Sequence, residues 1–247
     1  MNSIDHKERD AKKVEEMFSD IAARYDLLNH VLSLGLDIRW RKRVAQETGR
    51  CDSIPRKINC QSILDVCTGT GDMAIELCKF WKGNAHIEGI DFSHGLIEIG
   101  RKKIKNANLQ DKIIFREGDA EKLSYKNEQF DAITITFGLR NINNRLKALK
   151  EFYRVTKTGG CFVCLEFSQP KGPIFAKIYS FYLMIIIPFV SKILSSDPAA
   201  YKYLGNTIRD FPSPVELVKL IESAGWRDVT HYTLAGGIVA IHRGRKY

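Results

Sequence analysis

Acidic side chains stand at the ends of three consecutive predicted strands in the first half of the chain. The stretch ILDVCTGTGD, residues 63–72, is typical of a strand that runs into a glycine turn. The next two predicted strands, HIEGID and KIIFREGD, end at or close to Asp91 and Asp119. Because ligands of open α/β sheets bind outside the carboxyl ends of the strands, these acids predict one binding site.

The residue types of the glycine turn indicate which ligand it holds. In a dinucleotide fingerprint a third glycine is needed, but Cys67 takes the earlier glycine position and Asp72 would repel a pyrophosphate. The chain also has no G-x-x-x-x-G-K-[ST] phosphate loop. A ligand with a cationic sulfonium and an amino-acid end fits better, because Asp65 and Asp72 complement positive groups. Gly69 and Gly71 would let the backbone approach such a ligand closely.

The acids after the second and third strands suit a nucleoside. Asp91 stands roughly 20 residues beyond the turn, where an acid accepts hydrogen bonds from both ribose hydroxyls. Asp119 and Ala120 lie on a loop that can hydrogen-bond or pack an adenine. For any one of these acids a helix cap or a solvated loop charge is the alternative. Their occurrence at three consecutive strand ends favours the ligand site.

The elements that position these residues follow from the hydrophobic pattern. From residue 62 onward short apolar runs alternate with helical stretches, which predicts a largely parallel sheet with helices on both faces. The ending WRDVTHYTLAGGIVAIHRG predicts an antiparallel hairpin. Apolar spacings predict helices over residues 7–24 and 38–48, and Ser213 and Glu216 stand at capping-box spacing.

The composition of the chain limits which binding partners and which cellular compartment are expected. The formal net charge of +9 favours nucleic acid or an anionic membrane surface, although a basic enzyme without either is the alternative. The apolar stretch 174–194 is too short to span a bilayer, and it suits an interfacial segment or else a buried core or dimer helix. The charged N-terminus predicts no secretory signal. Six cysteines without framework spacing predict reduced cytosolic thiols and no metal site.

Several segments together resemble one enzyme family. The glycine turn and its acids are similar to those of class I S-adenosylmethionine-dependent methyltransferases, and the resemblance covers most of the chain. Within that class the chain resembles the ubiquinone/menaquinone biosynthesis C-methyltransferases. The segments that carry this likeness are YDLLNHVLSLGLDIRW (25–40), ITITFGLRNI (133–142), RVTKTGGCFVCLEFS (154–168), YKYLGNTIRDFP (201–212) and GGIVAIHRG (236–244).

The resemblance implies a fold and a division of the chain. The fold would be α/β and Rossmann-like, with a mostly parallel seven-stranded sheet, a C-terminal antiparallel hairpin and helices on both faces. Residues 1–50 would form a helical lid over the substrate, and residues 51–247 the methyltransferase domain. Within that domain, residues 174–212 would be an apolar insertion that meets the substrate or the membrane.

The resemblance also implies a site for S-adenosyl-L-methionine. It places Thr70 in the turn, Asp91 at the ribose, Asp119 and Ala120 at the adenine, and Thr136 after the fourth strand. With the turn residues, the expected cofactor-binding set is Thr70, Asp91, Asp119, Ala120, Thr136, Asp65, Gly69 and Gly71. The departures are mild, since family members often have Gly or Ala where this chain has Cys67 or Thr68, and a usual proline is Thr158 here.

The acceptor in this family is a ring carbon of a polyprenylated hydroquinone. Since the sulfonium already activates the methyl group, the protein must position the ring and raise the electron density of its carbon, which deprotonation of a ring hydroxyl does. Arg140 is expected to stabilise the phenolate, and Asn141 to orient the ring or a water; Glu166 is a further candidate. Asp26 is a third candidate catalytic residue, and with His30 it could fold over the site as a lid. Arg140 in a surface salt bridge and His30 in helix packing are the alternatives.

These implications define the expected partners. They are a polyprenylated quinol and the anionic inner face of the cell membrane, for a cytoplasmic and peripherally bound protein that could form a homodimer. We expect demethylmenaquinol as the acceptor, with the benzoquinol precursor of ubiquinone as the alternative. Nucleic acid is not expected, because TFGLRN replaces an N/D-P-P-Y-like motif, and Cys161 and Cys164 fall too early in their strand to act as nucleophiles. A non-enzymatic quinone-binding or membrane-binding module is disfavoured by the complete cofactor site.

Overall fold

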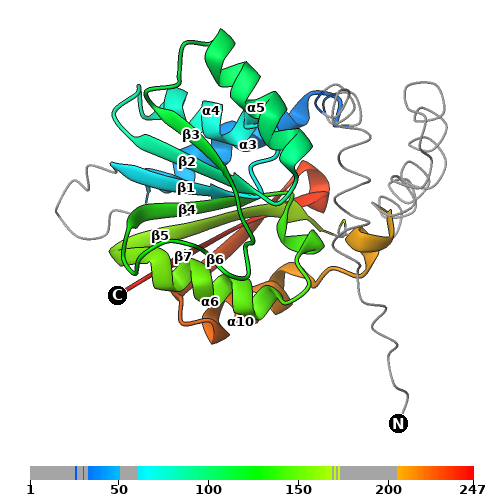
Figure 1. Cartoon of the computed structure of the whole chain (residues 1–247). Coiled ribbons are helices and arrows are strands. Elements are labelled where there is room, and N and C mark those ends of the chain that lie inside the picture. Colours follow the sequence, from blue (N-terminus) through cyan, green and yellow to red (C-terminus); the bar gives the residue numbers. More distant parts are fainter. Residues whose placement is uncertain are drawn as a thin grey trace.

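A seven-stranded sheet forms the centre of the protein (Figure 1). The computed structural model describes residues 26, 30, 33–50, 61–168, 170, 172 and 205–247. The strand order is β3-β2-β1-β4-β5-β7-β6, and only β7 runs antiparallel to its two neighbours. The strands are β1 Ser62–Val66, β2 His86–Asp91, β3 Ile113–Glu117, β4 Phe130–Thr136, β5 Thr156–Phe167, β6 Arg227–Leu234 and β7 Val239–Arg245.

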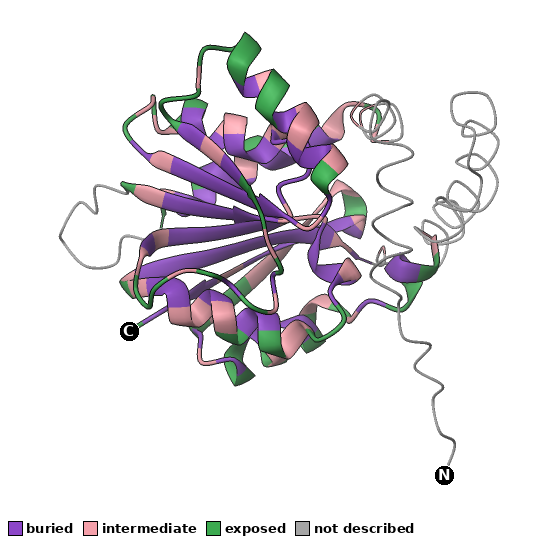
Figure 2. Ribbon diagram, viewed as in Figure 1, coloured by how far each residue is buried: buried purple, intermediate pink, exposed green. Residues whose placement is uncertain are grey.

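Helices cover both faces of this sheet (Figure 1). One face carries α3 (Leu36–Thr48), α4 (Asp72–Phe80) and α5 (His94–Asn106), and the other carries α6 (Arg145–Val155) and α10 (Pro214–Ser223). Residues of the sheet and of the inward helix faces are mostly buried, while residues on the outward helix faces are intermediate or exposed (Figure 2). Each face has its own hydrophobic cluster, which is what a sheet buried on both sides requires.

The strand order fixes where a ligand can bind. β1 pairs with β2 on one side and with β4 on the other, so the chain reverses its direction of strand addition at β1. Crossover connections leave opposite sides of the sheet at such a point and open a crevice at the carboxyl ends of the strands. The glycine turn, the end of β2 and the end of β4 all lie at that edge of the sheet.

The fold prediction is confirmed over the described residues. The sheet, its antiparallel C-terminal hairpin and the helices on both faces are all present. Ser213 caps α10 in a capping box with Glu216, as the spacing predicts. The predicted helix 7–24, the boundary near residue 50–51 and the apolar insertion 174–212 lie outside the described residues, apart from residues 50 and 205–212. None of the described helices is long and apolar enough to cross a membrane.

One cysteine differs from the expectation. Cys161 and Cys164 belong to the clusters on opposite faces of the sheet, as their spacing in a strand predicts. Cys67, Cys78 and Cys164 are free thiols. Cys161 is disulfide-bonded, so the prediction that all six cysteines are reduced is wrong for this residue. Sequence spacing missed it because a disulfide depends on which strands and loops meet in space.

Buried His242 in β7 should make stability depend on pH. Its Nε2 lies 2.9 Å from the Pro214 carbonyl oxygen, and burial lowers the pKa of the ring to about 4. A lowered folded-state pKa gives stability that is present above the unfolded value of about 6.5 and is lost as pH falls towards 4. Urea unfolding of the wild type and of His242→Gln, which keeps a donor for Pro214, should differ in slope over this range, with the wild type losing about 3 kcal/mol more. Equal slopes would contradict this role.

Candidate functional site

The glycine turn after β1 has a strained backbone. Cys67, Gly69 and Gly71 have φ values of 54°, 56° and 86°. A Cβ at Gly71 would collide with the Phe115 ring, so this glycine serves the packing of β3 as well as the turn. The sequence interpretation, which assigned Gly71 to close approach of a ligand, missed this packing reason. The Thr68 amide donates to the Ile90 carbonyl at 2.9 Å and ties the turn to β2.

Two buried carboxylates, those of Asp65 and Asp91, accept hydrogen bonds from residues of this turn. Asp65 accepts hydrogen bonds from the Thr68 and Thr134 hydroxyls at 2.6 and 2.7 Å. Asp91 accepts from the Gly69 amide and from the Ser93 amide, each at 2.9 Å. Burial raises the pKa of both Asp65 and Asp91 to about 6. Both carboxylate oxygens of Asp65 therefore accept hydrogen bonds from within the protein. Asp91 instead links the turn to the end of β2, where a ribose is expected.

The other predicted cofactor residues lie at the same edge of the sheet. Thr136 ends β4, and its buried Oγ1 has no hydrogen-bond partner among the described residues. A buried hydroxyl without a partner fits a site that a polar ligand completes. Asp119 accepts a hydrogen bond from the Glu121 amide at 2.8 Å, and Ala120 beside it is buried. This donor and acceptor set fits S-adenosylmethionine.

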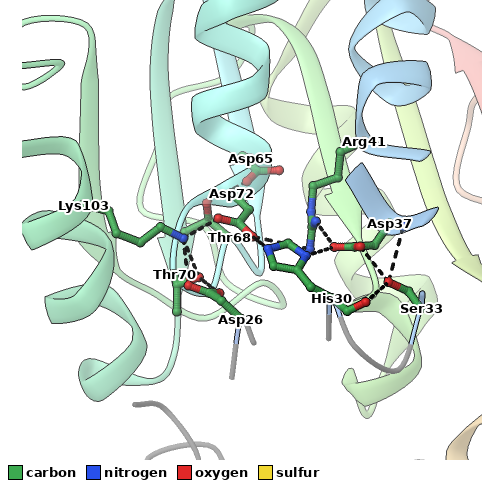
Figure 3. Close-up of polar contacts among 10 residues, drawn as sticks. All are labelled: Asp26, His30, Ser33, Asp37, Arg41, Asp65, Thr68, Thr70, Asp72 and Lys103. Carbon is green, nitrogen blue, oxygen red and sulfur yellow. Dashed lines mark hydrogen bonds and ion pairs between the residues drawn. The ribbon is translucent and has the colours of Figure 1, made fainter. Parts of the chain in front are cut away.

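Positively and negatively charged side chains alternate in a series of ion pairs beside the glycine turn (Figure 3). The Lys103 ammonium of α5 lies 2.9 Å from Asp26 Oδ2 and also contacts Asp72 Oδ1 at the start of α4. The Thr70 hydroxyl donates to Asp26 Oδ1 and accepts from Lys103 at 3.3 Å. Asp26, predicted from the sequence as a residue over the site, is therefore brought directly to the glycine turn.

His30 and Arg41 continue the chain beyond Asp72. His30 Nε2 and Arg41 Nη2 each lie 3.7 Å from Asp72 Oδ2. Both also reach Asp37 in α3, with 2.6 Å between His30 Nδ1 and Asp37 Oδ2 and a direct ion pair from Arg41. Burial opposes ionisation of Asp37, but a hydrogen bond from Ser33 and the Arg41 charge lower its pKa below the usual value. We call Asp26, His30, Asp37, Arg41, Thr70, Asp72 and Lys103 the charged network.

Arg140 forms a buried ion pair near the ends of β4 and β5. It lies in the short helix η2 (Leu139–Asn141), with Nη1 2.8 Å from Glu166 Oε1. Its backbone amide donates to Glu166 Oε2 at 3.2 Å, and its guanidinium donates to the Phe137 carbonyl. Arg140 and Glu166 are only 6% and 1% exposed, so the surface salt bridge considered from the sequence is wrong. Asn141 follows as the half-buried last residue of η2.

Aromatic rings border this ion pair. The Arg140 guanidinium lies over the Phe167 ring at 5.3 Å, and the Phe137 and Phe167 centroids are 4.6 Å apart. Trp40 of α3 meets Phe137 edge-on at 6.1 Å. Phe137 has a left-handed φ of 57°, a strained conformation that the surrounding structure must hold. We call Trp40, Phe137 and Phe167 the aromatic wall; it is an apolar cluster of packed rings beside a cation.

The glycine turn and the segment that carries Arg140 are in direct contact. A Cβ at Gly138 would collide with the Cys67 side chain, so η2 packs directly on the glycine turn. Arg140 is two residues from this contact. The predicted cofactor residues and the predicted phenolate-stabilising residue are thus neighbours at one sheet edge.

Sequence reasoning missed six contributors to this site, namely Lys103, Trp40, Arg41, Phe137, Asp37 and Phe167. Lys103 stands among other lysines of an amphipathic helix and gave no signal. Trp40 and Arg41 lie inside the resembling segment 25–40 or next to it, but helical spacing alone assigns them to packing and solvent. Phe137 lies in the resembling segment 133–142 and directly follows Thr136, so its position after a strand end was a clue to a role at the site.

Comparison with known proteins agrees with this geometry. A model of the ubiE/COQ5 methyltransferase family matches residues 5–246. The chain belongs to this family. Among ubiE/COQ5 relatives, it is 42% identical to the demethylmenaquinone methyltransferase of Streptomyces avermitilis, over 95% of this chain and 94% of that protein. It is 38% identical to the ubiquinone/menaquinone biosynthesis C-methyltransferase UbiE of Geobacter sulfurreducens, over 95% of this chain and 89% of that protein.

Solved structures share the fold of this ubiE/COQ5 member. The [4+2]-cyclase SpnF aligns with a TM-score of 0.67 at 16% identity, covering 94% of this chain and 95% of that one. The phosphoethanolamine N-methyltransferase 2 of Haemonchus contortus, solved in complex with S-adenosyl-L-methionine, aligns with a TM-score of 0.61 at 12% identity. That alignment covers 84% of this chain and 52% of that one. At such identities the likeness establishes the Rossmann-like fold.

Proposed function

We propose that this ubiE/COQ5 methyltransferase transfers a methyl group from S-adenosylmethionine to a ring carbon of a polyprenylated hydroquinone. The relatives named as demethylmenaquinone methyltransferases make demethylmenaquinol the favoured acceptor and menaquinol the product. The observation that carries this proposal is the buried Arg140–Glu166 pair beside the aromatic wall, packed against the glycine turn. A site built for a flat phenolic ring needs this combination of an apolar surface and a cation.

Each group of residues has a defined task in this function. Bound S-adenosylmethionine supplies a methyl group that its sulfonium activates. Asp91 and the Asp119–Ala120 loop bind its nucleoside, while Thr136 donates or accepts one hydrogen bond from its buried hydroxyl. The aromatic wall orients the acceptor ring, and Arg140 stabilises negative charge on the ring oxygen.

The identity of the methyl acceptor can be tested by measuring the quinones that cells contain. In cells that lack the protein, mass spectrometry should find demethylmenaquinone accumulated and menaquinone lost, and the purified protein should methylate a short-chain demethylmenaquinol with S-adenosylmethionine. Accumulation of the unmethylated benzoquinol precursor instead would favour the ubiquinone pathway, which some relatives' names also include. Unchanged quinones together with no turnover in vitro would contradict the proposal.

The same function requires contact with a membrane, because a polyprenyl tail stays in the bilayer. Leu34 and Ile38 at the start of α3 are 79% and 45% exposed, which is unusual for large apolar side chains. Arg39 and Lys42, also exposed, lie on the same helix in a chain of net charge +9. We therefore propose peripheral binding to anionic lipid with Leu34 and Ile38 entering the interface.

Vesicle binding should depend on this patch. The pair of changes Leu34→Ser and Ile38→Ser should lower partitioning onto anionic vesicles roughly tenfold, because two apolar side chains no longer enter the lipid. Val215→Ser removes an equally apolar side chain that is 56% exposed on α10 and should leave partitioning unchanged. Co-sedimentation at low salt measures both. The patch assignment fails if the two variants behave alike or if the wild type does not bind.

A further inference from the structure

The crossover from β3 to β4 is a loop without a helix. The other connections between neighbouring parallel strands carry one each, with α4 between β1 and β2, α5 between β2 and β3, and α6 between β4 and β5. Residues 118–129 instead cross the sheet with an isolated bridge between Asp119 and Lys122. On the same face of the sheet α6 packs on β5, and α10 packs on β6 and β7 (Figure 1). Since a loop fills less space than a crossover helix, room remains over β2 and β3.

A pocket of about 370 Å³ occupies this space, which is a usual size for a small-molecule site. Glu88, Ile90 and Arg116 line it from the sheet, and Leu123 and Tyr125 line it from the loop. Ile90 and Leu123 belong to the hydrophobic cluster of the α6 face. The pocket therefore combines apolar walls with a few polar groups.

This pocket extends away from the expected cofactor site. Asp119 borders it at the carboxyl edge of the sheet, but Glu88 stands three residues before Asp91 in β2, about 10 Å along a strand. Gln129, which also lines the pocket, directly precedes β4 and so lies at the opposite edge of the sheet. A ligand in the pocket would bind beside the nucleoside and not in its place.

The pocket contains a buried hydroxyl that the protein leaves unpaired. Tyr125 Oη is enclosed and forms no hydrogen bond within the part of the chain that the structure describes. Burial and the negative charge of the buried Glu88 raise the pKa of Tyr125 above its usual value, so the phenol stays protonated. Its ring meets Phe130 edge-on, with centroids 4.9 Å apart. A ligand hydroxyl that accepts from Tyr125 and donates to Glu88 would satisfy both groups.

Positive charge is available at the mouth of the pocket. Lys122 and Lys126 are exposed lining residues, and neither ammonium has an ion pair among the described residues. Arg116 donates its Nε to Glu88 at 3.2 Å, and its side chain is 58% exposed. The acidic lining residues already have partners in the protein: Glu88 has Arg116, Glu117 has His94, and Asp119 has the Glu121 amide. The charge left for a ligand is therefore positive.

We propose that this pocket is a second ligand site, which binds a small organic anion that carries a hydroxyl group on an apolar body, of the hydroxyaryl carboxylate class. The carboxylate binds at the two lysines and Arg116, the hydroxyl bridges Tyr125 and Glu88, and the body fills the apolar part of the pocket. This site goes beyond the proposed methyl transfer, because these residues belong neither to the expected cofactor set nor to the aromatic wall.

Removing one hydroxyl from the protein and one from the ligand tests this arrangement. The probes are 4-hydroxyphenylacetate and phenylacetate, titrated by saturation-transfer NMR into the full-length protein with S-adenosylhomocysteine added to fill the cofactor site. Tyr125→Phe should weaken binding of 4-hydroxyphenylacetate about tenfold and change that of phenylacetate less than about twofold. The two losses should not add, because both changes remove the same hydrogen bond.

Matched variants locate the site. Lys122→Gln combined with Lys126→Gln should weaken binding of both probes about fivefold, whereas Lys105→Gln, at an exposed lysine of α5, should change neither. The double variant Arg140→Gln, Glu166→Gln should bind both probes as the wild type does, since it alters only the expected quinol site. The inference is overturned if the wild type shows no saturable binding at millimolar concentrations, in which case a water fills the place beside Tyr125. Equal losses of both probes in Tyr125→Phe, or weaker binding by the Arg140 double variant, would overturn it as well.

Discussion

Replacing Arg140 by glutamine should lower kcat for quinol methylation about 10²–10³-fold, the usual effect of removing one preorganised group that stabilises developing negative charge. The ring hydroxyl has an ordinary pKa of about 10, so its ionised form needs a fixed cation at neutral pH. The affinity for S-adenosylhomocysteine should stay within about twofold of the wild type, because the hydrogen bonds that hold Asp91, the expected ribose-binding residue, do not involve Arg140. Steady-state kinetics and titration of the same preparations measure both quantities.

The stability of this variant needs its own control. Arg140→Gln leaves the Glu166 carboxylate buried without its cation, which costs about 3–5 kcal/mol. Changing Glu166 to glutamine as well should recover most of the stability but not the activity. Arg116→Gln removes an arginine that pairs with Glu88 at the β3 edge and should turn over normally. Near-normal turnover by Arg140→Gln, or recovery of kcat in the double variant, would contradict the role of Arg140.

The sequence predicted the sheet and the residues at its strand ends because both follow from short-range patterns. Alternating strands and helices allow few topologies, and a parallel sheet brings Asp65, Asp91, Asp119 and Thr136 to one edge. The site residues that were missed depend on contacts between distant elements. Lys103 reaches Asp26 across 77 positions, and Trp40 meets Phe137 from a different layer. Helical periodicity says which face of α5 is polar, but not that one lysine of that face crosses to the glycine turn.

The same contrast between local pattern and remote contact explains the three glycines of the site. The pattern G-T-G predicts a tight turn, and Gly69 and Gly71 both adopt positive φ. The need for glycine at 71 and at 138 also comes from neighbours that are remote in sequence, the Phe115 ring and the Cys67 side chain. The sequence assigns Gly71 to the ligand, since it cannot show which protein atoms fill the space.

Asp91 should make cofactor binding depend on pH. Its pKa is raised to about 6 by burial, and a ligand that donates two ribose hydroxyls to it favours the ionised form. Binding must then release a proton below about pH 6, so the affinity should rise up to about tenfold per pH unit from pH 5 to 6 and level off above 7. Calorimetric titration of S-adenosylhomocysteine in buffers of different ionisation enthalpy detects the released proton.

Asp91→Asn should remove most of this dependence and weaken binding about 10²-fold at pH 7.5, because each lost hydrogen bond to a charged acceptor is worth about 1.5–3 kcal/mol. Asp65 has a similarly raised pKa, but its oxygens accept from Thr68 and Thr134, so its ionisation is coupled more weakly to the ligand. Glu117→Gln is the matched control, since that exposed carboxylate ends β3 and pairs with His94. A pH-independent wild type, or an Asp91→Asn variant with the wild-type slope, would show that Asp91 holds the Gly69 amide without binding the ribose.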